Sequence, residues 1–133
     1  METTPVIKKH ILIIEDDHFI GEMYKQALIF AGFEVEWVTD GENGLSAAKT
    51  GAFDLILLDI MLPGRMGNDI LRELRSGPDP INTKIIVTTN FEQDKESRAA
   101  MEAQVDAYLI KADVTPRRLV EIIKDILSGA KQA

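Results

Sequence analysis

Two kinds of hydrophobic spacing alternate along the chain, and this alternation constrains the fold more than any other feature. Short apolar runs are typical of strands buried in a parallel sheet, whereas apolar residues three or four positions apart predict amphipathic helices. Strands are predicted at residues 11–14, 33–37, 53–58, 85–89 and 107–110. Helices are predicted at residues 20–31, 40–51, 70–76, 92–103 and 115–127. The pattern therefore predicts five consecutive strand–helix units.

Five strands that alternate with five helices indicate one class of architecture. Because strand–helix–strand crossovers are right-handed, the strands form a parallel sheet with helices on both faces, a three-layer α/β sandwich. A length of 133 residues fits one domain, and we expect its core at about residues 9–129, between short polar tails. Ligands of such sheets bind beyond the carboxyl ends of the strands, so we expect the functional residues there.

The composition excludes several classes of protein. The absence of cysteine excludes a disulfide scaffold, thiolate metal sites and a cysteine nucleophile. Acidic residues outnumber basic ones by 22 to 15, for a net charge of −7, so the chain has no electrostatic reason to bind nucleic acid or an anionic membrane. The polar N-terminus lacks the apolar segment of a signal peptide, and no apolar stretch is long enough to span a bilayer. We therefore expect a cytoplasmic protein.

Ionisable and hydroxyl side chains stand at the ends of the predicted strands. These residues are Glu15, Asp16, Asp59, Thr89 and Lys111. Parallel strands share one carboxyl edge, so the carboxylates converge, and their repulsion is relieved by Mg²⁺, which prefers oxygen ligands. A hydroxyl and an ammonium group opposite the ion would suit phosphate oxygens. The set predicts phosphoryl transfer to or from a carboxylate, with Asp59 as the nucleophile.

Three motifs, in this order, resemble the receiver domain of bacterial response regulators. They are Ile-Leu-Ile-Ile-Glu-Asp-Asp at 11–17, Asp-Leu-Ile-Leu-Leu-Asp-Ile-Met-Leu-Pro-Gly at 54–64 and Asp-Ala-Tyr-Leu-Ile-Lys at 106–111. The resemblance covers nearly the whole chain. It implies the flavodoxin-like (βα)5 fold with strand order 2-1-3-4-5, an order that the hydrophobic pattern alone does not give.

The resemblance implies how the carboxylates work. Asp59 would accept a phosphoryl group from the phosphohistidine of a sensor histidine kinase or a histidine phosphotransfer protein. Asp16 and Asp59 would bind Mg²⁺ directly and Glu15 through water. The backbone carbonyl of Met61 would complete the protein ligands of the ion.

The resemblance also implies a switch. Thr89 and Lys111 would bind the phosphoryl oxygens, and Tyr108 would turn inward when Thr89 moves toward the phosphate. Protein binding would then change at the face made by the fourth helix, fifth strand and fifth helix. Packing of an edge strand is the alternative role for Tyr108.

We therefore expect a stand-alone, single-domain response regulator that catalyses only its own phosphorylation and dephosphorylation. Its output would be the binding of an unknown downstream protein. We expect a monomer, with dimerisation of the phosphorylated form left open.

Three other functions stay open on the sequence. An aspartate-nucleophile phosphatase would need a second acid two residues after Asp59, where Met61 stands. A receiver-like interaction module that takes no phosphate is disfavoured by the complete set of site residues. A flavin- or nucleotide-binding protein of similar topology would carry a phosphate loop in place of the acids after the first strand.

The sequence departs from the family pattern beside the site. A proline normally follows the site lysine, in a cis peptide bond, whereas Ala112 follows Lys111 here. A cis bond before any other residue costs about 3–4 kcal/mol, so we expect either a trans bond with a rearranged loop or a strained cis bond. Met61 and Phe91 are apolar at positions that control the access of water, and we expect them to shield the phosphorylated aspartate.

Overall fold

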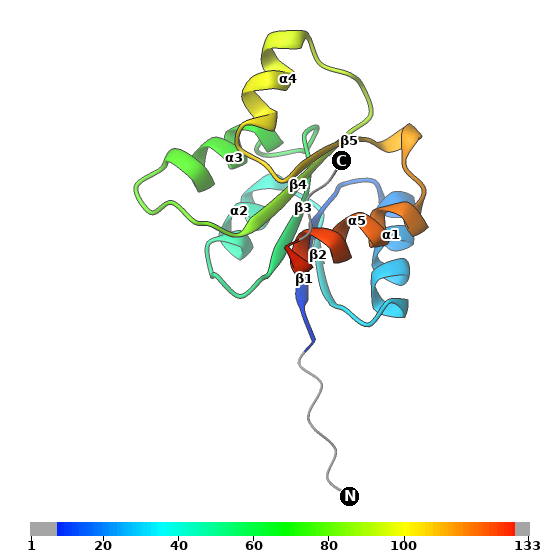
Figure 1. The fold of residues 1–133 in the computed structure, drawn as a ribbon. Helices are drawn as coiled ribbons and strands as arrows, with labels where there is room; N and C mark the ends of the chain where they lie inside the picture. The colour runs from blue at the N-terminus through cyan, green and yellow to red at the C-terminus, as the bar shows by residue number, and fades with distance from the viewer. Residues whose placement is uncertain (1–7, 130–133) are drawn as a thin grey trace, which may run out of the picture.

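A computed structural model describes residues 8–129, which form five strands and five α-helices (Figure 1). The strands are β1 (His10–Ile14), β2 (Glu34–Val38), β3 (Leu55–Asp59), β4 (Lys84–Thr89) and β5 (Ala107–Ile110). The helices are α1 (His18–Phe30), α2 (Gly41–Ala48), α3 (Gly67–Ser76), α4 (Lys95–Glu102) and α5 (Pro116–Ser128). The polar tails expected from the sequence lie largely outside the described residues, and none of the described helices is long and apolar enough to cross a membrane.

The strands form one parallel sheet in the order β2-β1-β3-β4-β5. This is the flavodoxin-like order implied by the family resemblance. Helices α1 and α5 cover one face of the sheet, and α2, α3 and α4 cover the other (Figure 1). The three-layer α/β prediction is therefore confirmed.

The two faces of the sheet build two separate cores. In β1, Leu12 and Ile14 pack with residues of α2, α3 and α4, whereas Ile11 and Ile13 pack with residues of α1 and α5. Successive strand residues point to opposite faces, so a strand that is covered on both sides needs apolar residues at every position. This explains the continuous apolar runs in the sequence.

Side-chain caps set where several helices begin. The Asp17 carboxylate accepts a hydrogen bond from the Ile20 N–H at 3.0 Å, and α1 starts at the next residue. Asp94 accepts from the Ser97 N–H at 2.9 Å, so α4 begins at Lys95 and not at residue 92 as the sequence pattern predicted. The N-cap residue itself has a non-helical backbone, so the helix cannot extend further toward the N-terminus.

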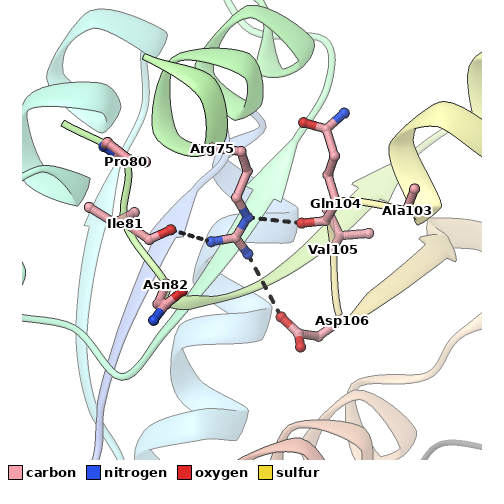
Figure 2. A pocket seen from close by; sticks show the side chains of 8 residues that line it. All are labelled: Arg75, Pro80, Ile81, Asn82, Ala103, Gln104, Val105 and Asp106. Atoms are coloured by element: carbon pink, nitrogen blue, oxygen red, sulfur yellow. Dashed lines mark hydrogen bonds and ion pairs between the residues drawn. The ribbon is translucent and has the colours of Figure 1, made fainter. Parts of the chain in front are cut away.

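The amino ends of β4 and β5 are joined by one arginine. Arg75, at the end of α3, donates from Nε to the Gln104 carbonyl and from Nη1 to the Ile81 carbonyl, both at 2.9 Å (Figure 2). Its Nη2 lies 3.9 Å from Asp106 Oδ2. A hollow of about 520 Å³ opens beside these residues, at the edge of the sheet opposite the carboxyl ends of the strands.

Candidate functional site

Three carboxylates meet at the carboxyl edge of the sheet. One oxygen from each of Glu15, Asp16 and Asp59 lies within 4.8 Å of the others. Glu15 and Asp59 are each only 2% exposed, while Asp16 is exposed. The sequence prediction that these acids converge is therefore confirmed by the geometry.

Tight packing at the start of α3 fixes the end of β3, where Asp59 lies. The Gly67 N–H donates to the Ile60 carbonyl at 2.7 Å. A Cβ atom at Gly67 would lie 2.3 Å from the carbonyl oxygen of Asp59, a distance that no side chain tolerates. Only glycine allows the helix to approach the strand this closely.

Lys111 reaches into the carboxylate cluster from the end of β5. Its Nζ lies 2.6 Å from Glu15 Oε1 and 3.3 Å from Asp59 Oδ1, and its side chain is 6% exposed. The bond to Ala112 is trans, because residues 8–129 contain no cis peptide. A short 3₁₀ helix, η1 (Lys111–Asp113), follows β5. Of the two expected arrangements, the structure has the trans bond, and Lys111 still points at Asp59.

Burial makes Asp59 difficult to ionise without a further cation. Desolvation, with the Glu15 carboxylate as the second cause, raises the pKa of Asp59 to about 7, and Lys111 opposes this shift. One ammonium group against three carboxylates leaves an excess of negative charge in a poorly hydrated site. An all-oxygen donor set with this excess of charge fits a hard divalent cation such as Mg²⁺.

Thr89 is buried at the end of β4, but its hydroxyl bonds within its own loop. The hydroxyl donates to the Phe91 carbonyl at 3.1 Å and lies 3.3 Å from the Phe91 N–H, from which it can accept. Thr88, the residue before it, is the one that pairs in register with Asp59. The predicted contact of Thr89 with phosphoryl oxygens stays a prediction.

Met61 turns its backbone N–H toward the site. This N–H donates to Asp59 Oδ1 at 3.4 Å, while the Met61 side chain stays largely in solvent at 51% exposure. Phe91 is likewise 70% exposed. The metal-binding carbonyl of Met61 and the shielding by both side chains stay predictions.

Tyr108 points into the protein. It is 8% exposed, and the Arg98 guanidinium carbon lies 4.7 Å from the centre of its ring. Its buried hydroxyl has no hydrogen-bond partner among the described residues. The position is the inward one, and the role as a switch stays a prediction.

Two residues near the site were not singled out by the sequence pattern. Burial, together with the charges of Glu15 and Asp59, raises the pKa of Tyr24 to about 12, so its hydroxyl stays protonated close to the acids. Trp37 donates its indole N–H to the Glu15 carbonyl at 2.8 Å. Both lie within elements that the sequence pattern predicted, but hydrophobic spacing does not show where a polar ring atom points.

Comparison with known families decides what kind of domain carries this site. The model of the response regulator receiver domain matches residues 11–124. The chain belongs to this family. The family that the sequence motifs predicted is therefore confirmed. The acidic cluster and Lys111 described above lie within the matched residues.

Curated relatives of the receiver domain are named as regulators. This chain is 35% identical to the transcriptional activator protein IrlR of Burkholderia pseudomallei over 118 residues, which cover 89% of this chain and 48% of IrlR. It is 40% identical to the response regulator protein PmrA of Pseudomonas aeruginosa over 101 residues, which cover 76% of this chain and 45% of PmrA. The chain therefore spans about half the length of these relatives.

Solved structures share the receiver fold over the full domain. A CheY-like receiver domain protein from Methanospirillum hungatei JF-1 is 36% identical, with a TM-score of 0.78. The alignment covers 92% of this chain and 96% of that one. The Francisella response regulator 1452 receiver domain, 23% identical with a TM-score of 0.82, supports the fold alone.

Proposed function

We propose that Asp59 accepts a phosphoryl group from the phosphohistidine of a sensor histidine kinase or a histidine phosphotransfer protein. The observation that carries this proposal is the convergence of Glu15, Asp16 and Asp59 with the buried ammonium of Lys111. The family match supports the type of donor, since receiver domains belong to two-component response regulators.

Glu15, Asp16 and Asp59 would hold Mg²⁺, with the backbone carbonyl of Met61 as the further ligand that the family implies. When bound, the ion supplies positive charge to offset the carboxylates and the phosphoryl oxygens. The ligand set contains only oxygen atoms, which suits this ion better than softer metals.

The transfer itself needs few groups from the protein. A carboxylate oxygen of Asp59 forms a bond to phosphorus while the bond from phosphorus to the donor imidazole nitrogen breaks, and its electron pair returns to the imidazole. Lys111, already 3.3 Å from Asp59, would balance charge on the phosphoryl oxygens. Water would later attack the phosphorus and restore the carboxylate.

Output would follow from the movement of Thr89. To reach the phosphoryl group, its hydroxyl must leave the backbone of Phe91, which loosens the loop between β4 and α4. Tyr108 and α4 lie beyond this loop, so the α4–β5–α5 face would change its affinity for a downstream protein. We propose that the domain acts on no external metabolite.

A second form of output is favoured by the length of the relatives. IrlR is named a transcriptional activator, and this chain matches 48% of it. A receiver that controls an attached transcription module is therefore the alternative to a stand-alone domain whose output is protein binding.

Intact-mass measurement after incubation with acetyl phosphate tests the proposal. We expect a gain of one phosphoryl group with Mg²⁺, little gain in EDTA and none in Asp59→Asn. Asp79→Asn, the same change at an exposed aspartate between α3 and β4, is the matched control and should be modified normally. No modification of the wild type would favour a phosphate-independent interaction module, and sustained turnover of a phosphoester would favour a phosphatase.

A further inference from the structure

We propose that Trp37 is a positioning residue for the metal-binding carboxylates and acts through the main chain of Glu15. The proposal rests on the proposed function above, in which Glu15 and Asp16 hold Mg²⁺. The indole Nε1–H of Trp37 donates to the Glu15 carbonyl oxygen at 2.8 Å. This contact reaches the site from β2, an edge strand that contributes no carboxylate to the cluster.

The indole N–H supplies a hydrogen bond at the point where the backbone hydrogen bonds between β1 and β2 end. β1 ends at Ile14, and the next N–H, that of Glu15, still donates to the Val38 carbonyl at 3.1 Å. The Glu15 carbonyl faces β2 but lies beyond the β1–β2 ladder, whose register ends at Ile14 and Val38. Since Glu15 is 2% exposed, an unpaired carbonyl here would be costly, and the indole N–H satisfies it.

The bonded carbonyl belongs to the peptide group that joins Glu15 to Asp16. Because a peptide group is planar, holding its oxygen also fixes the plane from which the Asp16 backbone continues. The Glu15 side chain is held separately, since Oε2 accepts from the Asp17 N–H at 3.1 Å and Oε1 faces Lys111 Nζ at 2.6 Å. Trp37 therefore determines the orientation of the peptide between two proposed metal ligands.

The Trp37 ring packs closely against α1. A Cβ atom at Gly21 would lie 2.2 Å from Trp37 Cζ2, so the ring fits only because residue 21 is glycine. The His18 ring meets the indole edge-on, with the centroids 5.6 Å apart. These contacts hold the indole N–H in place, so its hydrogen bond does not depend on a freely rotating side chain.

Replacing the single tryptophan separates the hydrogen bond from the packing. Because the chain has one tryptophan, benzothienylalanine, which has the shape of tryptophan without the N–H, can be incorporated biosynthetically at position 37 alone. Trp37→Phe is the genetic counterpart. Val35→Ala, which trims another half-buried residue of β2, is the control for a general loss of stability.

We expect both replacements of Trp37 to weaken Mg²⁺ binding about threefold to tenfold in isothermal titration calorimetry, in line with the loss of one hydrogen bond. The rate of phosphorylation by acetyl phosphate at saturating Mg²⁺ should change less than about twofold, because the acceptor and Lys111 are untouched. Unchanged Mg²⁺ affinity would overturn the proposal. The proposal would also be overturned if Val35→Ala, at a free energy of unfolding equal to that of the Trp37 variants, weakened Mg²⁺ binding to a similar extent.

A second measurement needs neither metal nor phosphate. Backbone amide exchange of Asp16 and Asp17 should accelerate in the benzothienylalanine protein, while amides in β4 keep their protection. Equal exchange in both proteins would overturn the role of Trp37. A wild type that binds no Mg²⁺ and gains no phosphoryl group would instead overturn the proposed function, and the exchange result would still decide the role of Trp37.

Discussion

Asp59 is held where its charge is unfavourable. It is buried beside Glu15, and its pKa is raised from 3.8 to about 7 by desolvation first and by the Glu15 charge second. The folded protein therefore binds this proton more tightly than the unfolded chain does. The contribution of this proton to the free energy of unfolding is greatest below the pKa that Asp59 has in the unfolded chain. It is lost as the pH rises through the pKa of Asp59 in the folded protein.

The metal-free protein should show this dependence directly. We expect Asp59→Asn to be more stable than the wild type at about pH 8 by about 2–4 kcal/mol, and the gain to shrink toward about pH 5. Urea unfolding in EDTA at both pH values measures the difference. A gain that is the same at both pH values would show that ionisation of Asp59 is not its cause.

Lys111 should matter for stability as well as chemistry. Lys111→Met leaves Glu15 and Asp59 buried without their ammonium partner, and we expect a loss of about 3 kcal/mol without metal, partly recovered by Mg²⁺. Lys84→Met is the control, because the half-exposed Lys84 lies 3.7 Å from Asp106 Oδ1. Thermal unfolding that shows equal losses in both variants would contradict the expectation.

The charged residues of the site could be predicted from the sequence. The hydrogen bonds that hold the surrounding backbone could not. The ends of parallel strands share an edge, so the placement of Glu15, Asp59 and Lys111 follows once the strands are assigned. The indole bond from Trp37 depends on the neighbour of β1 in the sheet, and periodicity does not give strand order. The bonding of Thr89 within its own loop depends on a local backbone turn that no motif encodes.

The aromatic ring of Tyr108 in β5 contacts Arg98 of α4. Arg98 lies over Tyr108 and also bonds Glu92 at 2.6 Å and Glu102 at 3.2 Å, so it connects the β4–α4 loop, α4 and β5. This arrangement links the loop that holds the Thr89 hydroxyl to the ring predicted to be the switch.

The buried hydroxyl of Tyr108 gives a prediction for this element. It lacks a hydrogen-bond partner among the described residues, so Tyr108→Phe should raise the free energy of unfolding by about 0.5–1.5 kcal/mol. Chemical denaturation measures the change. Arg98→Met should lower stability in the same assay, since it loses the ring contact and two ion pairs. Destabilisation by Tyr108→Phe would indicate that the hydroxyl is bonded in solution.

The prediction of elements failed mainly at boundaries. Strand and helix positions followed from hydrophobic period, but the α4 pattern was extended to residue 92 because polar residues before Asp94 carry no periodic signal. Likewise α3 begins at Gly67, earlier than its first apolar residue, since the close contact with β3 and not helix propensity sets its start.

Binding of Mg²⁺ should stabilise the whole domain. The carboxylates lie at the end of β3 and directly after β1, adjacent strands of the sheet, so the ion would favour the folded state as a unit. Above its Kd, each tenfold rise in free Mg²⁺ should add about 1.4 kcal/mol to the free energy of unfolding. Asp16→Asn, which alters an exposed carboxylate proposed as a ligand, should flatten this dependence in a thermal shift series, and an unchanged slope would argue against the site.

The hollow beside Arg75 has a practical consequence. It lies at the amino ends of β4 and β5, across the sheet from the carboxylates, and exposed Asn82 lines it (Figure 2). The chain contains no cysteine, so Asn82→Cys would introduce a unique thiol. A fluorophore attached there would lie beside the segments that lead into two strands of the site, and it would report changes in them without obstructing the carboxyl edge of the sheet.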